Sequence, residues 1–352
     1  MMTLLLCSSS PVRRHAERLM DRITVLETHC DFPEVFYYHP NSGYNLVTED
    51  AKGQVSVAKM RKGHMNADYL AYYLRPAPDQ TDSAACEIAP QQLWDMMNVI
   101  EPYVRALDSY CGIARTAKDA ETLRKQGKIA FFFGLENAFF VGNDLKNLEI
   151  LRDRNITYIT LSHWGDNQFC HSSDRGKDPS KGLTEKGREL VAEMNRLGIV
   201  IDLSHTSYGT WKDVLELSKA PVAFTHSGAA GVYKHQRNVD DETLRALARN
   251  GGVIQVYMVN NFMADKEHYG DVGVKEMVDH ICHIVKVAGI DHVGIGVDFD
   301  GGGGGVGIRS AADAVNITVE LINRGFSDED ITKIWGGNWL RVLTEVQALA
   351  EK

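Results

Sequence analysis

The stretch Ile129-Ala130-Phe131-Phe132-Phe133 decides the fold, because five consecutive apolar residues leave no polar face. A strand with one side in water would place a polar residue at every second position. A continuous apolar run is instead typical of a strand that helices cover on both sides, which is the arrangement of parallel sheets. This stretch therefore predicts a parallel β-sheet with helices packed on its faces.

Comparable β-rich runs recur along the chain, and most are followed by a segment with helical spacing. In residues 184–197, apolar side chains return every three or four positions, and Gly198 supplies a stop signal. Residues 241–250 and 274–288 show the same spacing. The predicted strands are residues 23–28, 67–73, 128–134, 156–162, 199–204, 221–225, 252–258 and 292–297.

Eight strand-then-helix units favour an α/β fold of the (β/α)8 or TIM barrel type, formed as a single domain over residues 1–352. The alternative is a doubly wound open sheet, which is disfavoured because no glycine-rich phosphate-binding fingerprint follows the first strand. We expect a hairpin or lid at about residues 32–63 and terminal helices at about residues 311–346. The reactive groups of such a barrel come from the carboxyl ends of its strands.

The composition limits the functions open to this chain. Its 352 residues, 44% of them hydrophobic and 24% charged, are enough to bury a large core, and its net charge of -9 disfavours nucleic acid and anionic lipid as partners. Six cysteines without a Cys-x-x-Cys pair favour a reducing, cytoplasmic location. An apolar run at residues 4–6 before Cys7 is too short for a signal peptide, so a lipoprotein or exported form is disfavoured. No stretch has the length of a transmembrane segment.

Side chains that can bind metals end several of the predicted strands. His29 and Asp31 close the first strand and lie two positions apart, so they share one face. Glu136, His205 and His226 each end a later strand. Burying so many titratable groups at one barrel mouth is unfavourable without a cation, although any one of them alone is more often a structural polar residue. The set therefore predicts a metal site.

Nitrogen and oxygen ligands without a thiolate suit zinc, although manganese, cobalt or iron could occupy the same ligands. Two ions fit if Glu136 bridges them, with His29 and Asp31 on one ion and His205 and His226 on the other. Paired metals in hydrolases lie ~3.5–4 Å apart and activate a shared water. We therefore expect a two-metal hydrolase.

Three further residues have candidate roles around this cluster. Asp298 is the first polar residue after the last apolar run, which makes it the candidate general base. His163 follows the fourth strand and is a candidate donor to a developing oxyanion. Arg237 lies shortly after His226 and is a candidate clamp for a substrate carboxylate. The alternatives are a capping or salt-bridged aspartate, a core histidine and a solvated loop arginine.

Six motifs stand out in the second half of the chain. They are Gly182-Leu183-Thr184-Glu185-Lys186-Gly187, Ile201-Asp202-Leu203-Ser204-His205, Phe224-Thr225-His226-Ser227, Arg237-Asn238-Val239-Asp240-Asp241, Gly296-Val297-Asp298-Phe299-Asp300-Gly301 and Asn338-Trp339-Leu340-Arg341-Val342. In this order they closely resemble the membrane dipeptidase (renal dipeptidase) family, and the resemblance covers the chain from about His29 to Val346. The resemblance implies a metallo-dependent hydrolase barrel of the amidohydrolase type, two zinc ions per chain and hydrolysis of dipeptides, often with a D-residue in second position.

The resemblance implies the same residue roles that the strand ends suggest. The residues that correspond to the family's zinc ligands are His29, Asp31, Glu136 as the bridge, His205 and His226. The residues that correspond to its substrate-facing groups are Asp298 for proton transfer, His163 for the tetrahedral intermediate and Arg237 for the substrate carboxylate. We therefore expect a metal-bridging hydroxide to attack the peptide bond of a dipeptide, in a protein for which a homodimer is a candidate assembly.

Departures from the family pattern bear on substrate choice. Glu27-Thr28-His29-Cys30-Asp31 stands where the family usually has Asp-Gly-His-Asn-Asp, and Gly134-Leu135-Glu136-Asn137-Ala138 replaces the usual Glu-Gly-Gly-His run. Five glycines at 301–305 predict a mobile loop beside Asp298. Another amidase or deacylase with the same two metals is therefore the alternative function. A non-enzymatic metal-binding protein is disfavoured, since no ligand or base is missing.

Overall fold

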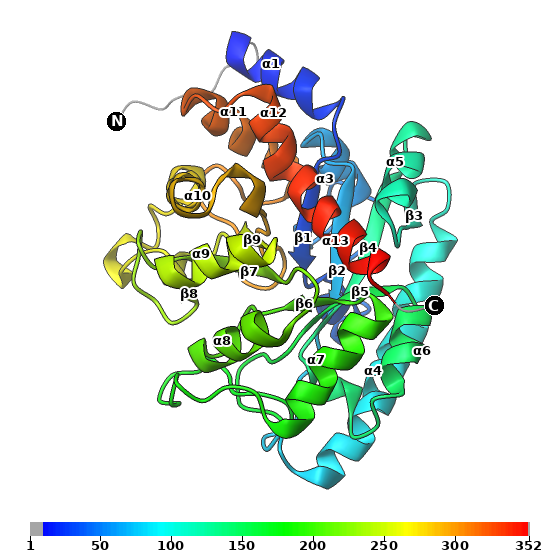
Figure 1. Cartoon of the computed structure of the whole chain (residues 1–352). Coiled ribbons are helices and arrows are strands. Elements are labelled where there is room, and N and C mark those ends of the chain that lie inside the picture. Colours follow the sequence, from blue (N-terminus) through cyan, green and yellow to red (C-terminus); the bar gives the residue numbers. More distant parts are fainter. Residues whose placement is uncertain (1–9, 351–352) are drawn as a thin grey trace.

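Parallel strands follow one another around the core of residues 10–350, the part of the chain that the computed structural model describes (Figure 1). Each strand pairs with the next one on the path, and Asp31 N donates to Phe299 O at 2.8 Å where the last strand returns to the first. The predicted (β/α)8 barrel is therefore confirmed. In path order the strands are β1 Leu26–Cys30, β2 Ala67–Tyr72, β4 Ile129–Glu136, β5 Ile156–Thr160, β6 Val200–Asp202, β7 Ala223–Ala229, β9 Val253–Val256 and β10 Val293–Ile295.

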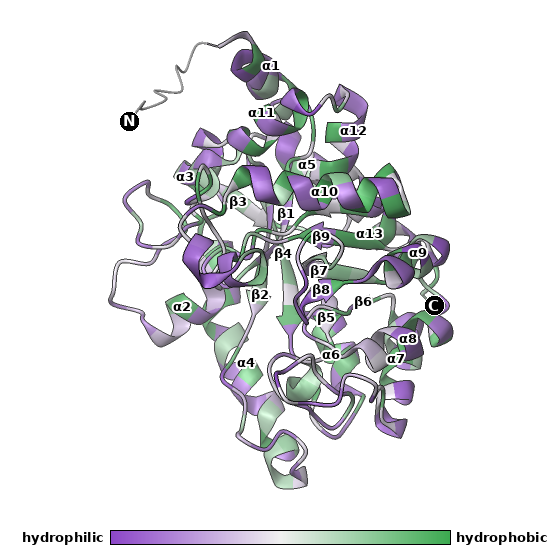
Figure 2. Ribbon diagram, turned by 90° about the vertical axis from the view of Figure 1, so that its left-hand side faces the viewer, coloured by the Kyte–Doolittle hydropathy of each residue, from purple (hydrophilic) through white to green (hydrophobic). Residues whose placement is uncertain are grey.

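Helices surround the strands and carry both hydrophilic and hydrophobic residues (Figure 2). The best-predicted helix, α7 at Glu185–Leu197, begins where Thr184 Oγ1 accepts from Gly187 N and ends at Gly198 with φ of 70°. The other surrounding helices are α4 Ser83–Ala106, α5 Ala117–Lys125, α6 Asn147–Asp153, α8 Tyr208–Leu217, α9 Asp241–Asn250, α10 Val274–Ala288 and α11 Val315–Asn323, with α1 Pro11–Met20 packed on α11.

The barrel interior is closed at its amino end by the C-terminal helices. Trp339, from α13 (Asn338–Ala348), donates to Tyr69 OH at 3.1 Å and packs against the ring of Tyr158. Tyr69 in turn stacks on Phe132, so aromatic rings fill the barrel interior toward its amino end. The predicted terminal helices are present, with α12 Asp328–Thr332 continuing through the π-helical turn η6 Lys333–Gly337 into α13, and the 3-10 turn η5 Ala311–Asp313 preceding α11.

Some local structure differs from the expectations. Residues 32–63 contain two helices, α2 Phe32–Tyr38 and α3 Val57–Lys62, and no strand, so this segment is not a β-hairpin, and its alternative role as a lid stays a prediction. Two short strands were not expected, β3 Cys111–Ile113 beside β4 and β8 Asn238–Val239 beside β7. β3 and β8 show no apolar run of their own, whereas the equally short β6 and β10 lie within longer apolar runs that predicted them.

Asp202 fastens three neighbouring strands together at the barrel mouth. Its buried carboxylate accepts from Thr160 Oγ1 and Thr225 Oγ1, both at 2.6 Å, and from Thr225 N at 2.8 Å. It also accepts from Ser204 N and Ser204 Oγ at 3.0 and 2.8 Å. The ends of β5, β6 and β7 are therefore held in fixed register.

Two sequence expectations concern membranes. Within the described residues, none of the helices combines the length and the apolar character that crossing a bilayer requires. The apolar run at 4–6 and Cys7, which bear on the lipoprotein alternative, lie outside the described residues.

Candidate metal centre

All five predicted ligands converge at the carboxyl ends of the strands. Glu136, the last residue of β4, lies at the centre: its Oε1 is 3.3 Å from His205 Nε2 and 3.4 Å from His226 Nε2. Its Oε2 is 3.6 Å from His29 Nε2, and the ring centroids of His29 and His226 lie 3.8 Å apart. His29 Nε2 lies 3.8 Å from Asp31 Oδ1. The two oxygens of Glu136 thus face two different groups of side chains.

These distances fit a shared cation better than direct contacts. Hydrogen bonds between nitrogen and oxygen are about 2.7–3.2 Å long, so most of these pairs are too far apart. Two ligands ~2.0–2.1 Å from a tetrahedral zinc are instead separated by ~3.3–3.4 Å. His29 Nε2, His226 Nε2 and Asp31 Oδ1 are buried and have no hydrogen-bond partner within the described part of the chain. Leaving such atoms unpaired is unfavourable by about 1–3 kcal/mol each, so the residues fit a metal.

Hydrogen bonds on the far side of two imidazoles orient them toward Glu136. The Thr225 hydroxyl donates to the Asp202 carboxylate, so its oxygen accepts from His226 Nδ1 at 2.9 Å. The Nε2 lone pair of His226 is then free to bind a cation. His29 Nδ1 similarly lies 2.9 Å from Tyr158 OH.

Burial controls the charge of the cluster in the absence of metal. Desolvation raises the pKa of Glu136 to about 8 and that of Asp298 to about 7, and it raises the pKa of Asp31 well above its ordinary value. Desolvation also lowers the pKa values of His205 and His226 well below the ordinary range. The imidazoles are therefore neutral, which is the form that binds metals, whereas the carboxyls hold protons that a cation would displace.

Asp298 lies close enough to the cluster to exchange protons there. It follows β10, and one of its carboxyl oxygens, a ring nitrogen of His29 and a carboxyl oxygen of Asp31 lie within 4.8 Å of one another. A Cβ atom at Gly301 would lie 1.9 Å from Asp31 Oδ2 and 2.2 Å from Asp298 Oδ1, so only glycine fits. Gly303 N donates to Asp298 O at 2.8 Å. The glycine loop is therefore tied to the centre by close packing, which its composition alone did not predict.

His163 lies just after β5, and one of its ring nitrogens lies within 4.8 Å of ligand atoms of Glu136 and His205. Its ring centroid is 4.2 Å from that of His205 and 4.5 Å from that of Tyr73. Removal from water, helped by the charge of Arg237, lowers the pKa of His163 to about 3. The side chain is therefore a neutral imidazole near pH 7, with one N–H to donate.

Arg237 lies fully inside the protein, so the solvated alternative is wrong. The side chain is 1% exposed, and its two terminal nitrogens donate to His226 O at 3.0 Å and Ser227 Oγ at 3.3 Å. The rings of Tyr257 and Phe262 flank the guanidinium at 5.8 and 5.7 Å. No described carboxylate lies within salt-bridge distance, and Nε has no hydrogen-bond partner among the described residues. A buried cation without a counter-ion is suited to binding an anion.

Glu27 is a site residue whose role the sequence did not reveal. Its Oε2 accepts from His29 N at 2.9 Å, and its Oε1 accepts from Asp298 N at 3.3 Å. The Glu27 carboxyl therefore connects β1 to the loop after β10, at the backbone of the candidate site residues His29 and Asp298. Its position two residues before His29, on the same strand face, was the available signal.

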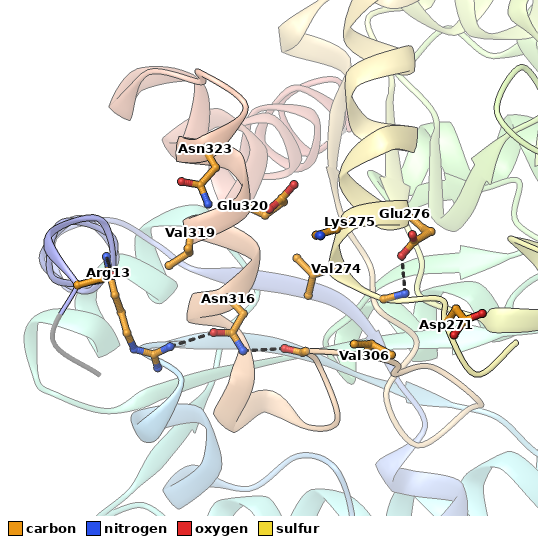
Figure 3. A pocket seen from close by; sticks show the side chains of 13 residues that line it. Arg13, Asp271, Val274, Lys275, Glu276, Val306, Asn316, Val319, Glu320 and Asn323 are labelled. Carbon is orange, nitrogen blue, oxygen red and sulfur yellow. Dashed lines mark hydrogen bonds between the residues drawn. The ribbon is translucent and has the colours of Figure 1, made fainter. Parts of the chain in front are cut away.

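A separate pocket of about 730 Å³ lies between α1, the start of α10 and α11 (Figure 3). Arg13, Val274, Val306 and Val319 are among its lining residues, and Arg13 Nη1 donates to Asn316 Oδ1 at 2.9 Å. None of the predicted site residues lines it. The metal-ligand cluster therefore lies elsewhere, at the barrel mouth.

Comparison with known proteins places this geometry in a family. Residues 13–352 match the family model of membrane dipeptidase, peptidase family M19. The chain is 30% identical to dipeptidase ataJ of Aspergillus terreus over 97% of this chain and 89% of that protein.

Solved structures agree with the family match. The probable dipeptidase PvdM of Pseudomonas aeruginosa is 28% identical, with a TM-score of 0.86 over 97% of this chain and 100% of that one. A second structure, named dipeptidase AC of family M19, is 25% identical, with a TM-score of 0.83 over 92% of this chain and 99% of that one. The chain therefore belongs to the membrane dipeptidase family, the M19 metallopeptidases, and is a hydrolase that acts on peptide bonds.

Proposed function

We propose that this chain holds two zinc ions and hydrolyses dipeptides, L,D-dipeptides among them. The observation that carries the two-metal proposal is that the two oxygens of Glu136 face different ligand groups, at 3.6 Å from His29 on one side and 3.3 Å from His205 on the other. The L,D-dipeptide substrate rests on the family resemblance. Arg237 supports a dipeptide as the substrate, because its positive charge lies at the same mouth and can pair with a C-terminal carboxylate.

Following the family resemblance, we assign the ligands to two sets about Glu136. His29 and Asp31 would hold one ion, and His205 and His226 the other, with Glu136 shared between them. His226 also lies beside His29 and Glu136, and its imidazole is therefore within reach of both positions. When bound, the zinc ions would supply a Lewis acid and lower the pKa of a shared water from ~15.7 to ~7. Manganese, cobalt or iron would fit the same oxygen and nitrogen ligands.

The remaining residues then have distinct tasks. The Asp298 carboxylate takes a proton from the attacking water and returns it to the leaving amine. The neutral His163 donates an N–H to the oxygen on which negative charge develops. Arg237 pairs with the C-terminal carboxylate and so fixes which bond lies at the metals.

Another amidase or deacylase is the second candidate function, since it would use the same metals. It would have no need of a buried, unpaired arginine, and the observed state of Arg237 therefore favours a substrate with a free carboxylate. The cytoplasmic location stays a prediction from the sequence.

Replacement of Asp298 by Asn tests the proton transfer. We expect metal content to stay at the wild-type level, because the amide keeps the shape of the side chain, while kcat falls by ~10²–10⁴-fold. Atomic absorption and steady-state kinetics measure the two quantities. Asp271→Asn, at an exposed aspartate, is the matched control and should leave both unchanged. Full activity of Asp298→Asn would remove Asp298 from the mechanism.

Replacement of Arg237 by Ala separates the two candidate functions. Wild-type kcat/KM should favour a dipeptide over its C-terminal amide by ~10–100-fold, since a charged hydrogen bond contributes about 1.5–3 kcal/mol. Arg237→Ala should abolish that preference, whereas Arg188→Ala, at an arginine paired with Asp213 at 3.5 Å, should keep it. A preference that survives in Arg237→Ala would favour the amidase or deacylase.

The pH dependence of stability tests the metal ligands without any substrate. Glu136 and Asp298, with pKa values of about 8 and about 7, keep protons in the metal-free fold that the unfolded chain has already released. The free energy of unfolding of the metal-free protein should therefore fall as pH rises from 6.5 to 8. The lowered histidine pKa values act in the opposite direction, but only at and below about 6.5.

Urea unfolding of chelator-treated and zinc-reloaded protein measures this trend. Zinc keeps the ligand carboxylates ionised across the window, so the reloaded protein should show a much smaller fall. Glu136→Gln should make the metal-free fall smaller and leave the contribution of Asp298, because that variant has no proton to lose at position 136. Parallel trends with and without zinc would mean that Glu136 does not bind the metal.

A further inference from the structure

Three buried amide side chains link three loops at the barrel mouth. Gln80 follows β2, Asn137 follows β4 directly after Glu136, and Asn167 lies in the loop after β5. Their exposed fractions are 5%, 0% and 2%, so each polar atom needs a partner inside the protein. We call these three residues the amide chain.

The amides are bonded to one another in sequence. Asn137 Nδ2 donates to Gln80 Oε1 at 2.7 Å, and Asn167 Nδ2 donates to Asn137 Oδ1 at 2.9 Å. The free end of Gln80 donates from Nε2 to Trp164 O at 2.9 Å. One continuous path therefore runs from the residue after Glu136 to the residue after His163.

Backbone groups fix the orientation of each amide. Asn167 Oδ1 accepts from Phe169 N at 2.9 Å and from Cys170 N at 3.1 Å, so its Nδ2 must point to Asn137. That Nδ2 also donates to Leu161 O at 2.8 Å. Neither Asn137 nor Asn167 can therefore flip without losing several bonds, and the chain has one arrangement.

The backbone is adapted to the amide chain. Asn137 has φ of 83°, which is uncommon for a residue other than glycine, and its Oδ1 accepts from Phe139 N at 3.1 Å. Gly165 has φ of 95°, and a Cβ atom there would lie 2.8 Å from Gln80 Nε2. Because residue 165 is a glycine, the loop after β5 leaves space for Gln80 Nε2 next to its hydrogen bond to Trp164 O.

The segment that Gln80 holds borders the metal centre. The Trp164 ring lies 5.0 Å from the ring of His205, and the His163 ring lies 4.2 Å from the same imidazole. Gln80 itself makes no hydrogen bond or ion pair with a candidate metal ligand or with Arg237 in the described structure. Any influence it has on the reaction must pass through the position of other residues.

We propose that the amide chain is a positioning device in which Gln80 fixes the segment of His163 and Trp164 relative to Glu136. The effect on turnover rests on the proposed function, in which His163 donates to the developing oxyanion. Gln80 is in this sense a positioning residue, because it acts through His163. Loss of the bond to Trp164 O lets this segment shift away from the metals while the ligands stay in place.

Gln80→Leu tests the proposal, since leucine is of similar size and makes neither hydrogen bond. We expect kcat to fall by up to ~100-fold, as a displacement of about 1 Å can produce, while KM changes by less than about threefold. The absorption spectrum of cobalt-substituted Gln80→Leu should match that of the cobalt-substituted wild-type protein, because the metal ligands keep their geometry.

Asn338→Leu is the matched control. Asn338 is 3% exposed and donates from Nδ2 to Ile290 O at 2.7 Å and Val293 O at 2.8 Å, at the amino end of the barrel. The variant removes two buried bonds, as Gln80→Leu does, and should lower the melting temperature without changing kcat. A wild-type kcat in Gln80→Leu, with a lowered melting temperature like that of the control, would show that the amide chain is only structural.

Hydrogen exchange separates this proposal from the proposed function. Amide protons of Phe169 and Cys170, which bond to Asn167, should exchange at least ~10-fold faster in Gln80→Leu than in wild type and stay slow in Asn338→Leu. If exchange is faster in Gln80→Leu but the wild-type protein cleaves no dipeptide, the proposed function is rejected and the positioning role is kept. Unchanged exchange in Gln80→Leu would overturn the positioning role for any substrate.

Discussion

The desolvation of titratable side chains at one end of the barrel is the constraint on which the rest of the structure depends. Glu136 is 2% exposed and His29 and His226 are 0% and 1% exposed, so water does not solvate their polar atoms. The unpaired atoms among them require a cation, and Arg237 in the same mouth requires an anion. A protein that binds metal and a carboxylate-bearing substrate satisfies both needs.

Residues outside the ligand set hold the ligand side chains in position, on the side that faces away from Glu136. Asp202 joins three strand ends and, through Thr225, orients His226. From β5, Tyr158 reaches His29 on β1 across a position where a Cβ atom at Gly134 would lie 2.2 Å from the Tyr158 ring. The ligand geometry is therefore a property of the closed sheet and of residues that never touch a metal.

Strands and helix ends, which depend on neighbouring residues, could be predicted from the sequence, whereas contacts between distant segments could not. Apolar runs such as 129–133 predicted the strands, and the polar residues that end those strands predicted which side chains meet at the mouth. Helix boundaries were also recovered, because a cap such as Thr184 and a stop such as Gly198 are local signals.

Contacts between distant segments had no such signal. The bond from Tyr158 to His29 and the fit of Gly301 against two carboxyl groups depend on strand order and register. Two short strands, β3 and β8, escaped notice for a related reason, since pairing with a neighbour defines them more than their own sequence does. The buried state of Arg237 was likewise invisible, because most loop arginines are exposed.

Diffraction at the zinc absorption edge from crystals of the zinc-loaded protein tests the central claim most directly, because anomalous scattering locates metals without assuming their ligands. The account predicts two peaks per chain, ~3.5–4 Å apart, with the carboxylate of Glu136 between them. A single peak, or a pair of peaks that Glu136 does not bridge, would contradict it.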